Sequence, residues 1–158
     1  MNHKKFFEYY INKDLSSPIL NGSVDKVREL IDVNPDAKAY LVQNTHFGPE
    51  QHQKWGQRWY APLQYAVFEN QIGIVQLLVG ELGVNVDSVQ THTAVSSNPG
   101  AWTSLHLAVL KNNLPMVEAL LECGADDSIG GNIKGTHFKD AKDLALKSGH
   151  TSMARCFK

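Results

Sequence analysis

The chain contains several copies of one short sequence unit, and this internal repetition constrains its fold more than any other feature. The clearest copy begins at Thr103 and reads "TSLHLAVLKNNLPMVEALLECGAD". A second copy begins at Ala61 and has one extra residue near Leu82, and weaker copies begin at Pro18 and Asp140. A repeated unit of this length predicts a fold in which similar structural modules stack on one another.

Each copy has the pattern of two short helices joined by a turn. In the clearest copy, apolar residues at helical spacing mark a first helix that includes Leu105 and a second helix that includes Val117. One such pair of helices cannot bury its apolar face alone, so each copy needs neighbours. We expect a small residue of the first helix to be buried where neighbouring copies meet, at Ala66, Ala108 and Ala145.

The residue that reverses the chain between the two helices is Gly or Asn in every copy. Both residue types tolerate the left-handed backbone geometry that ends a helix. The residues at this position are Gly22, Asn70, Asn112 and Gly149. In the clearest copy, Gly124 is expected just past the end of the second helix.

The first helices differ in how they begin. Thr103 and Asp140 are predicted to cap their helices, because their side-chain oxygens can accept a hydrogen bond from a first-turn amide, whereas Ala61 cannot. Pro18 occupies the place that holds Ala in the other copies. We therefore predict that Ser17 caps this helix and that Pro18 takes the first helical position.

The segments "TSLHLA" from Thr103 and "APLQYA" from Ala61 are similar to the T-P-L-H-x-A signature of the ankyrin repeat family. The resemblance extends over roughly residues 13–158. It implies an all-α solenoid of about four helix-turn-helix repeats with enlarged β-hairpin loops. In this family the signature histidine forms hydrogen bonds within the turn network, which implies a structural role for His106.

The resemblance also predicts how the chain is divided. It implies a single ankyrin-repeat domain over residues 1–158, with an N-terminal capping helix over residues 1–14. The repeats are expected at residues 15–39, 60–87, 102–130 and 139–158. Long inserts, at residues 40–59 and 88–101, fall where this family places its β-hairpin fingers. Loops of this length in a compact domain are often functional.

Composition narrows the class of protein. The 158 residues carry a net charge of −1, which gives no support for a nucleic-acid or membrane-surface binder. Two cysteines are too few for a disulfide-built secreted fold, so a reducing compartment such as the cytoplasm is expected. The first residues are too polar for a signal peptide or a membrane span. We expect a monomeric, intracellular protein.

Seven histidines call for a test of metal binding and catalysis. Those in or near the inserts, His46, His52, His92 and His137, match no metal-site spacing, and no catalytic motif is present. We predict no catalytic, cofactor-binding or metal-binding residue, and Cys123 is expected to be a buried small hydrophobe. A small metal-binding protein or enzyme that uses loop histidines is the alternative from another class, and metal analysis of the purified protein distinguishes it.

The function implied by the resemblance is a non-catalytic protein–protein interaction module, a scaffold that binds a partner protein through its concave face and long loops. In this family the residues just before the turn point toward the concave face. Carried onto this chain, the partner-binding residues are Leu20, Asn21, Phe68, Glu69, Leu110 and Lys111. The apolar members Leu20, Phe68 and Leu110 could form one exposed ridge, because exposed apolar patches commonly mark interaction sites.

The first insert adds Trp55, Arg58 and Trp59 to the predicted partner-binding residues. Three interpretations of this segment stay open: it packs on the scaffold and covers the ridge, it anchors a protein partner, or it stacks nucleic-acid bases. A further alternative is a host-directed effector or regulator from a bacterium or virus. Such a protein would also act by binding, after translocation into a host cell.

Overall fold

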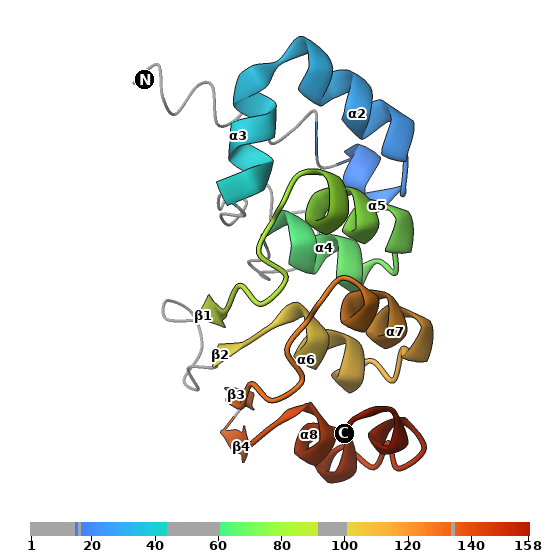
Figure 1. Cartoon of the computed structure of the whole chain (residues 1–158), viewed down its shortest axis with the longest axis vertical. Helices are drawn as coiled ribbons and strands as arrows, with labels where there is room; N and C mark the ends of the chain where they lie inside the picture. Colours follow the sequence, from blue (N-terminus) through green and yellow to red (C-terminus); the bar gives the residue numbers. More distant parts are fainter. Residues whose placement is uncertain (1–14, 16, 44–60, 92–100, 134) are drawn as a thin grey trace. The chain divides into compact units, whose positions relative to one another are not determined.

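The computed structural model describes residues 15, 17–43, 61–91, 101–133 and 135–158. The chain forms two compact units, Met1–Asn85 and Val86–Lys158. Figure 1 labels the helices and strands along the chain. The capping helix predicted over residues 1–14 lies outside the described residues. So do residues 44–60, which contain most of the first insert, and residues 92–100 of the second insert.

Short helices dominate the described parts of both units. The first unit contains helical residues 15 and 17–20, then α2 (Val24–Val33), α3 (Pro35–Gln43), α4 (Pro62–Phe68), α5 (Ile72–Gln76) and the π-helical segment η2 (Leu77–Glu81). The second unit contains β1 (Gln90–Thr91), β2 (Ala101–Trp102), α6 (Ser104–Leu110), α7 (Leu114–Glu122), β3 (Gly131–Ile133), β4 (Thr136–Phe138), α8 (Ala141–Lys147) and the 3-10 helix η3 (Met153–Cys156). Paired helices therefore occupy the segments in which the sequence predicts helix-turn-helix copies.

The same backbone hydrogen bond closes the turn of each helix pair. The residue after the left-handed position donates its N–H to the carbonyl five residues earlier. The N–O distances are 2.9 Å for Ser23–Pro18, 2.8 Å for Gln71–Ala66, 3.0 Å for Asn113–Ala108 and 2.8 Å for His150–Ala145. This is the long bond of a Schellman motif. The predicted positive φ angles are confirmed: 70° at Gly22, 60° at Asn70, 52° at Asn112 and 80° at Gly149.

Small residues pack the first helices, as predicted. Ala66, Ala108 and Ala145 are each 0% exposed. Pro18, which takes the same place in the first pair, is buried as well. The second helices bury a valine at matching positions, at Val27, Val75 and Val117. Because interiors are close-packed, these sites leave no room for a larger side chain without rearrangement.

The start of the first helix differs from the prediction. Leu15 is already helical and Ser17 lies within the helix, so the prediction that Ser17 caps it and Pro18 begins it is wrong. Leu15 is only 1% exposed, so extending the helix toward the N-terminus buries a large apolar side chain. A proline is tolerated near a helix start because the first amides have no carbonyl partner within the helix.

A further helix, α3, stands where the sequence analysis expected the end of a repeat and the start of an insert. Asn34 and Pro35 mark its beginning: Asn34 Oδ1 accepts from the backbone N–H of Asp36 at 3.1 Å. Ala37 and Leu41 are buried and fix one face of the helix. The Asn-Pro-Asp order is a recognisable helix-start signal that the repeat alignment obscured.

Most other helix ends follow the sequence. Asp140 caps α8, since its Oδ1 accepts from the N–H of Asp143 at 2.7 Å. Thr103 occupies the N-cap of α6, but its buried hydroxyl accepts no hydrogen bond from a first-turn amide, so the predicted side-chain cap is not formed there. Ala61 makes no side-chain cap before α4, as predicted. Gly124 has a φ of 87° just past α7, as predicted.

A small antiparallel sheet forms beside the helices of the second unit, in the order β1-β2-β3-β4. β1 and β2 pair near the two ends of the second insert, and β3 and β4 form the next hairpin. The pairing of Ala101 with Asn132 joins the two hairpins. A Cβ at Gly131 would collide with the carbonyl oxygen of Ala101 and the ring of Phe138, so only glycine permits this approach.

Ala108→Leu should destabilise the protein, because a buried site with no spare volume must rearrange around the larger side chain. We expect a loss of about 1–3 kcal/mol in the free energy of unfolding, measured by denaturant titration. Ala39→Leu, at an exposed position on α3, is the control and should have little effect. An unchanged midpoint for Ala108→Leu would contradict the alignment of the repeats.

Gly149→Ala tests the cost of the left-handed turn alone, because a Cβ there meets no atom within 4 Å. The positive φ should cost alanine about 1–2 kcal/mol of unfolding free energy. Gly149→Asn should cost clearly less, since asparagine already occupies the same turn position at Asn70 and Asn112. Equal losses for both variants in thermal melts would show that the backbone angle is not the cause.

Candidate functional site

The residues predicted to contact a partner lie next to the left-handed turns. The apolar members are Leu20 and Phe68, both half-buried, and Leu110, which is 36% exposed. The polar members are Asn21 and Lys111, both exposed, and Glu69, which is half-buried. Leu114, four residues after Leu110, is also 38% exposed and was not among the predicted residues.

In the first unit, two turns lie side by side. Gln71 Nε2 donates to the backbone carbonyl of Leu20 at 2.7 Å. The Gln71 side chain passes so close to Gly22 that a Cβ there would collide with it. Leu20 and Phe68 therefore belong to adjacent turns of one unit.

A corresponding contact occurs in the second unit. His150 Nε2 lies 3.4 Å from the carbonyl oxygen of Leu110, and because a carbonyl can only accept, the imidazole donates. His150 and Gln71 take the same place in their repeats, directly after the left-handed residue. The sequence analysis missed this role, although the position is polar in every copy.

The last helix pair replaces the apolar residue before the turn with Lys147. Its Nζ donates to the backbone carbonyl of His137 at 2.7 Å and lies 2.8 Å from Asp143 Oδ2. The Lys147 ammonium, together with the backbone N–H of Lys139, lowers the pKa of Asp143. The apolar series before the turns thus ends in an ion pair at α8.

Trp55, Arg58 and Trp59 lie outside the described residues. Their contact with a partner, and the competing interpretation that they cover the apolar ridge, therefore remain predictions.

The recurring turns and the paired hairpins are the elements that the signature led us to expect. A family model described as ankyrin repeats, in three copies, matches residues 19–130. The chain belongs to the ankyrin repeat family. A search of curated proteins finds no match. The fold of an ankyrin repeat protein is a solenoid of helix-turn-helix units, and such proteins generally bind other proteins.

The histidine of the ankyrin signature connects the third repeat to the β3–β4 hairpin. His106 Nδ1 accepts from the backbone N–H of Thr103 at 2.9 Å, and Nε2 lies 2.9 Å from the carbonyl oxygen of Ile129. These two partners require the neutral tautomer with hydrogen on Nε2. The ring also meets Phe138 edge-on, with centroids 4.6 Å apart.

Burial lowers the pKa of His106, an effect that outweighs the opposing influences of the Ile129 carbonyl and Asp87. Protonation of Nδ1 would also remove the acceptor for the Thr103 N–H. The folded repeat is therefore more stable with the His106 ring in its neutral form.

Among the residues that the structure describes, the other reactive side chains do not converge on one site. Cys123 directly follows α7 and is half-buried rather than fully buried, and burial raises the pKa of its thiol. His137 is exposed on β4, whereas His46, His52 and His92 lie outside the described residues. No cluster of three or more His, Cys, Asp or Glu that could hold a metal ion occurs in the part of the chain that the structure describes.

The helices were also compared with the length and hydropathy of a membrane span. Among the described residues, none is both long enough and apolar enough to cross a bilayer.

His106→Gln should retain the fold but reduce the dependence of its unfolding free energy on pH. Glutamine fills the same position in the second repeat, where Gln64 is 0% exposed. Folding lowers the pKa of His106 from its unfolded value of about 6.5. As the pH falls through that value, the unfolded chain binds more protons than the folded chain, so acid destabilises the wild type.

The measurement is unfolding free energy against pH from about 7.5 to 5, a range that spans the unfolded histidine pKa. Wild type should lose stability toward the acid end, and His106→Gln should lose less. His137→Gln removes an exposed imidazole and should behave like wild type. An unaltered slope in His106→Gln would rule out His106 as the source.

Proposed function

We propose that this ankyrin repeat protein is a non-catalytic binding module that recognises a partner protein through the residues before its turns and through its long loops. Family membership supports the general class, because ankyrin repeats generally mediate protein–protein interaction. The observation that carries the finer proposal is the partial exposure of large apolar side chains at equivalent turn positions in both units, at Leu20, Phe68 and Leu110.

The backbone at these positions is fixed, which favours binding. The backbone carbonyl of Leu20 accepts a hydrogen bond from Gln71 of the neighbouring turn, and the backbone carbonyl of Leu110 accepts one from His150. A side chain on a fixed backbone loses little conformational freedom when a partner binds it, so less of the interaction energy is lost to ordering. Half-exposed apolar groups on rigid turns are therefore suited to act as anchors.

The charged residues beside the apolar ones suggest what the partner carries. In the first unit the negatively charged Glu69 follows Phe68, and in the second unit the positively charged Lys111 follows Leu110. We propose a partner with apolar anchor residues and charges of both signs rather than a uniformly charged polymer such as nucleic acid. Apolar anchors bordered by polar groups are typical of protein interfaces.

The long inserts form the second part of the proposed interface. Trp55, Arg58 and Trp59 combine the residue types that most often dominate binding energy at interfaces. The strands β1 and β2 lie near the two ends of the insert at residues 88–101, and their antiparallel pairing holds these ends together. Loops anchored in this way commonly carry recognition residues.

We also propose that α8 and η3 form a fourth repeat of the same domain. Its turn has the same hydrogen bond and the same left-handed residue as the other helix pairs, and Ala145 is fully buried. Its second helix is reduced to a 3-10 segment.

Cys123 and Cys156 are both free, which fits the proposed cytoplasmic location.

Leu110→Ala and Phe68→Ala test the proposed anchors in a capture experiment from a lysate of the source organism, followed by affinity measurement on the captured protein. Each variant should weaken binding by about 1–3 kcal/mol, as expected for an interface anchor. Val33→Ala is the control, because Val33 is 75% exposed at the end of α2 and lies at no predicted contact position.

Thermal melts of the same variants separate binding from folding. Leu110→Ala should melt close to wild type, because its side chain is already partly in water. Undiminished affinity in both folded variants would remove the turn residues from the interface. A severe loss of stability in Phe68→Ala would instead identify that side chain as core, where truncation costs about 3–5 kcal/mol.

A further inference from the structure

Three positions that are buried in the second and third repeats are exposed in the last helix pair. In the third repeat they hold Leu105, Val109 and Ala119, and in the second repeat they hold Leu63, Val67 and Leu77, each with an exposed fraction of 5% or less. The last helix pair, α8 with η3, has Lys142, Leu146 and Cys156 at these positions. Leu146 is 52% exposed, and the other two residues are exposed as well. We call these three residues the end face.

The equivalence of positions holds along both helices of the pair. Its other core residues are buried as in the third repeat: Met153, Ala154 and Phe157 match Met116, Val117 and Leu120. In the third repeat α6 packs against α8, which covers the side of α6 that corresponds to the end face. The end face is therefore a surface that the other copies use for packing.

The segment that carries the end face is basic. Residues 131–158 contain six lysine and arginine residues and two acidic residues, whereas residues 1–130 contain nine basic and fourteen acidic residues. Both carboxylates of the segment have partners within it. Asp140 caps α8, and Asp143 pairs with Lys147 at 2.8 Å and accepts from the backbone N–H of Lys139 at 3.0 Å.

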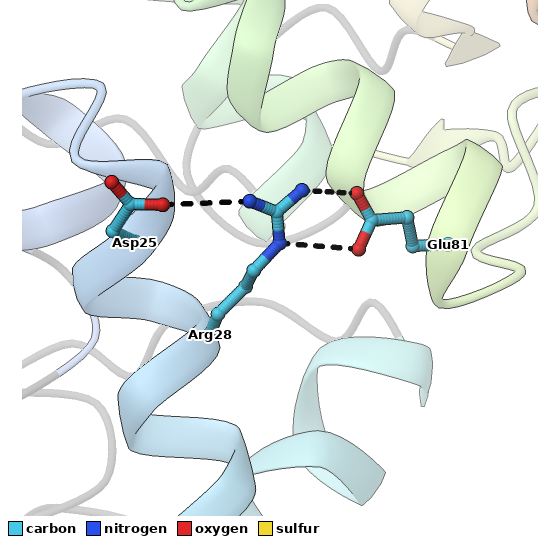
Figure 2. A network of polar contacts seen from close by, with 3 residues as sticks. All are labelled: Asp25, Arg28 and Glu81. Atoms are coloured by element: carbon cyan, nitrogen blue, oxygen red, sulfur yellow. Dashed lines mark hydrogen bonds and ion pairs between the residues drawn. The ribbon is translucent and has the colours of Figure 1, made fainter.

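Arg155 precedes Cys156 of the end face and differs from its counterpart in the first repeat. Arg28 takes the same place in its repeat, directly after a buried core residue. It lies between two carboxylates, those of Asp25 and Glu81 (Figure 2). Among the described residues, Arg155 and Lys142 form no ion pair. Both cationic side chains are therefore available to carboxylates of another molecule.

Lys142 limits what can cover Leu146. The two residues are four positions apart on α8, so their side chains are neighbours on one face of the helix. A surface that covers Leu146 also takes Lys142 out of water, and burying an unpaired ammonium group is costly. The covering surface must therefore supply a carboxylate as well as apolar area.

We propose that the end face binds an acidic segment of a partner protein, with a large apolar side chain packed on Leu146 and carboxylates paired with Lys142 and Arg155. None of the turn residues proposed above belongs to this site, so it is a second interaction surface.

Two other anionic partners fit the end face less well than an acidic protein segment. Unpaired nucleic-acid bases stack on aromatic side chains, and the end face contains none. Binding to an anionic bilayer depends on the apolar area that is inserted, and Leu146 is the one large apolar residue of the end face.

Selection of peptides from a displayed random library tests the proposal on the full chain without assuming a partner sequence. We expect the selected peptides that fail to bind Leu146→Ala to carry acidic residues beside a large apolar one. A synthetic copy of such a peptide should bind Leu146→Ala about tenfold more weakly than wild type, as for an interface anchor. Lys142→Glu and Arg155→Glu should also weaken binding, and a peptide with lysine in place of its acidic residues should prefer Lys142→Glu to wild type.

Two matched variants control for exposure and charge. Val89→Ala truncates an apolar side chain that is 51% exposed in the same unit, and Lys38→Glu reverses an exposed charge on α3. Both should bind the peptide like wild type. Thermal melts establish that each variant folds, and Lys142→Glu and Arg155→Glu carry the test alone if Leu146→Ala does not.

Several outcomes would overturn the proposal. One is the absence of selected peptides that depend on Leu146 and Lys142, and another is that such peptides lack acidic residues. Binding of phosphatidylserine vesicles or of a single-stranded DNA oligonucleotide that is lost in Leu146→Ala would assign the end face to a different class of partner. Self-association in sedimentation experiments that is lost in the same variant would assign it to a second copy of the chain.

Discussion

The hydrogen bond that closes each turn is the constraint on which the rest of the structure depends. It joins residues that are five positions apart and forms only when the residue between the helices is left-handed. Once it forms, the second helix returns along the first at a fixed angle, and Ala66, Ala108 and Ala145 are brought into close contact with their surroundings. The positions that we propose as partner-binding are set by the same bond, because they lie one or two residues before the turn.

The sequence predicts those parts of the fold that local chemistry determines. A glycine or asparagine at a left-handed position, a buried alanine, and a capping aspartate such as Asp140 each have a cause within a few residues. Repetition then strengthens the prediction, since a signal that is ambiguous in the first copy is clear in the third. The error at Ser17 follows the same logic: a local capping rule was applied where the burial of Leu15 decided the outcome.

Features that depend on contacts between repeats were not predictable from the sequence. The extra residue near Leu82 was visible in the alignment, but an insertion can lengthen a loop or form a π turn with the same sequence cost. The ion pair of Arg28 with Glu81 joins residues 53 positions apart, and no local pattern identifies it. For the candidate site, the apolar positions were identified by resemblance alone, and their degree of exposure needed the structure.

The turn-to-turn contacts have a consequence for how such a protein can change its partner. Gln71 and His150 bind the carbonyl groups of Leu20 and Leu110, not their side chains. Every amino acid carries that carbonyl, so the stacking contact is indifferent to which residue stands at the position. Substitutions there change the proposed partner-binding side chain while the hydrogen bond between neighbouring turns is preserved. In the proposed binding mode, partner specificity depends on the side chain and the contact between turns depends on the backbone carbonyl of the same residue, so the side chain can vary without loss of that contact.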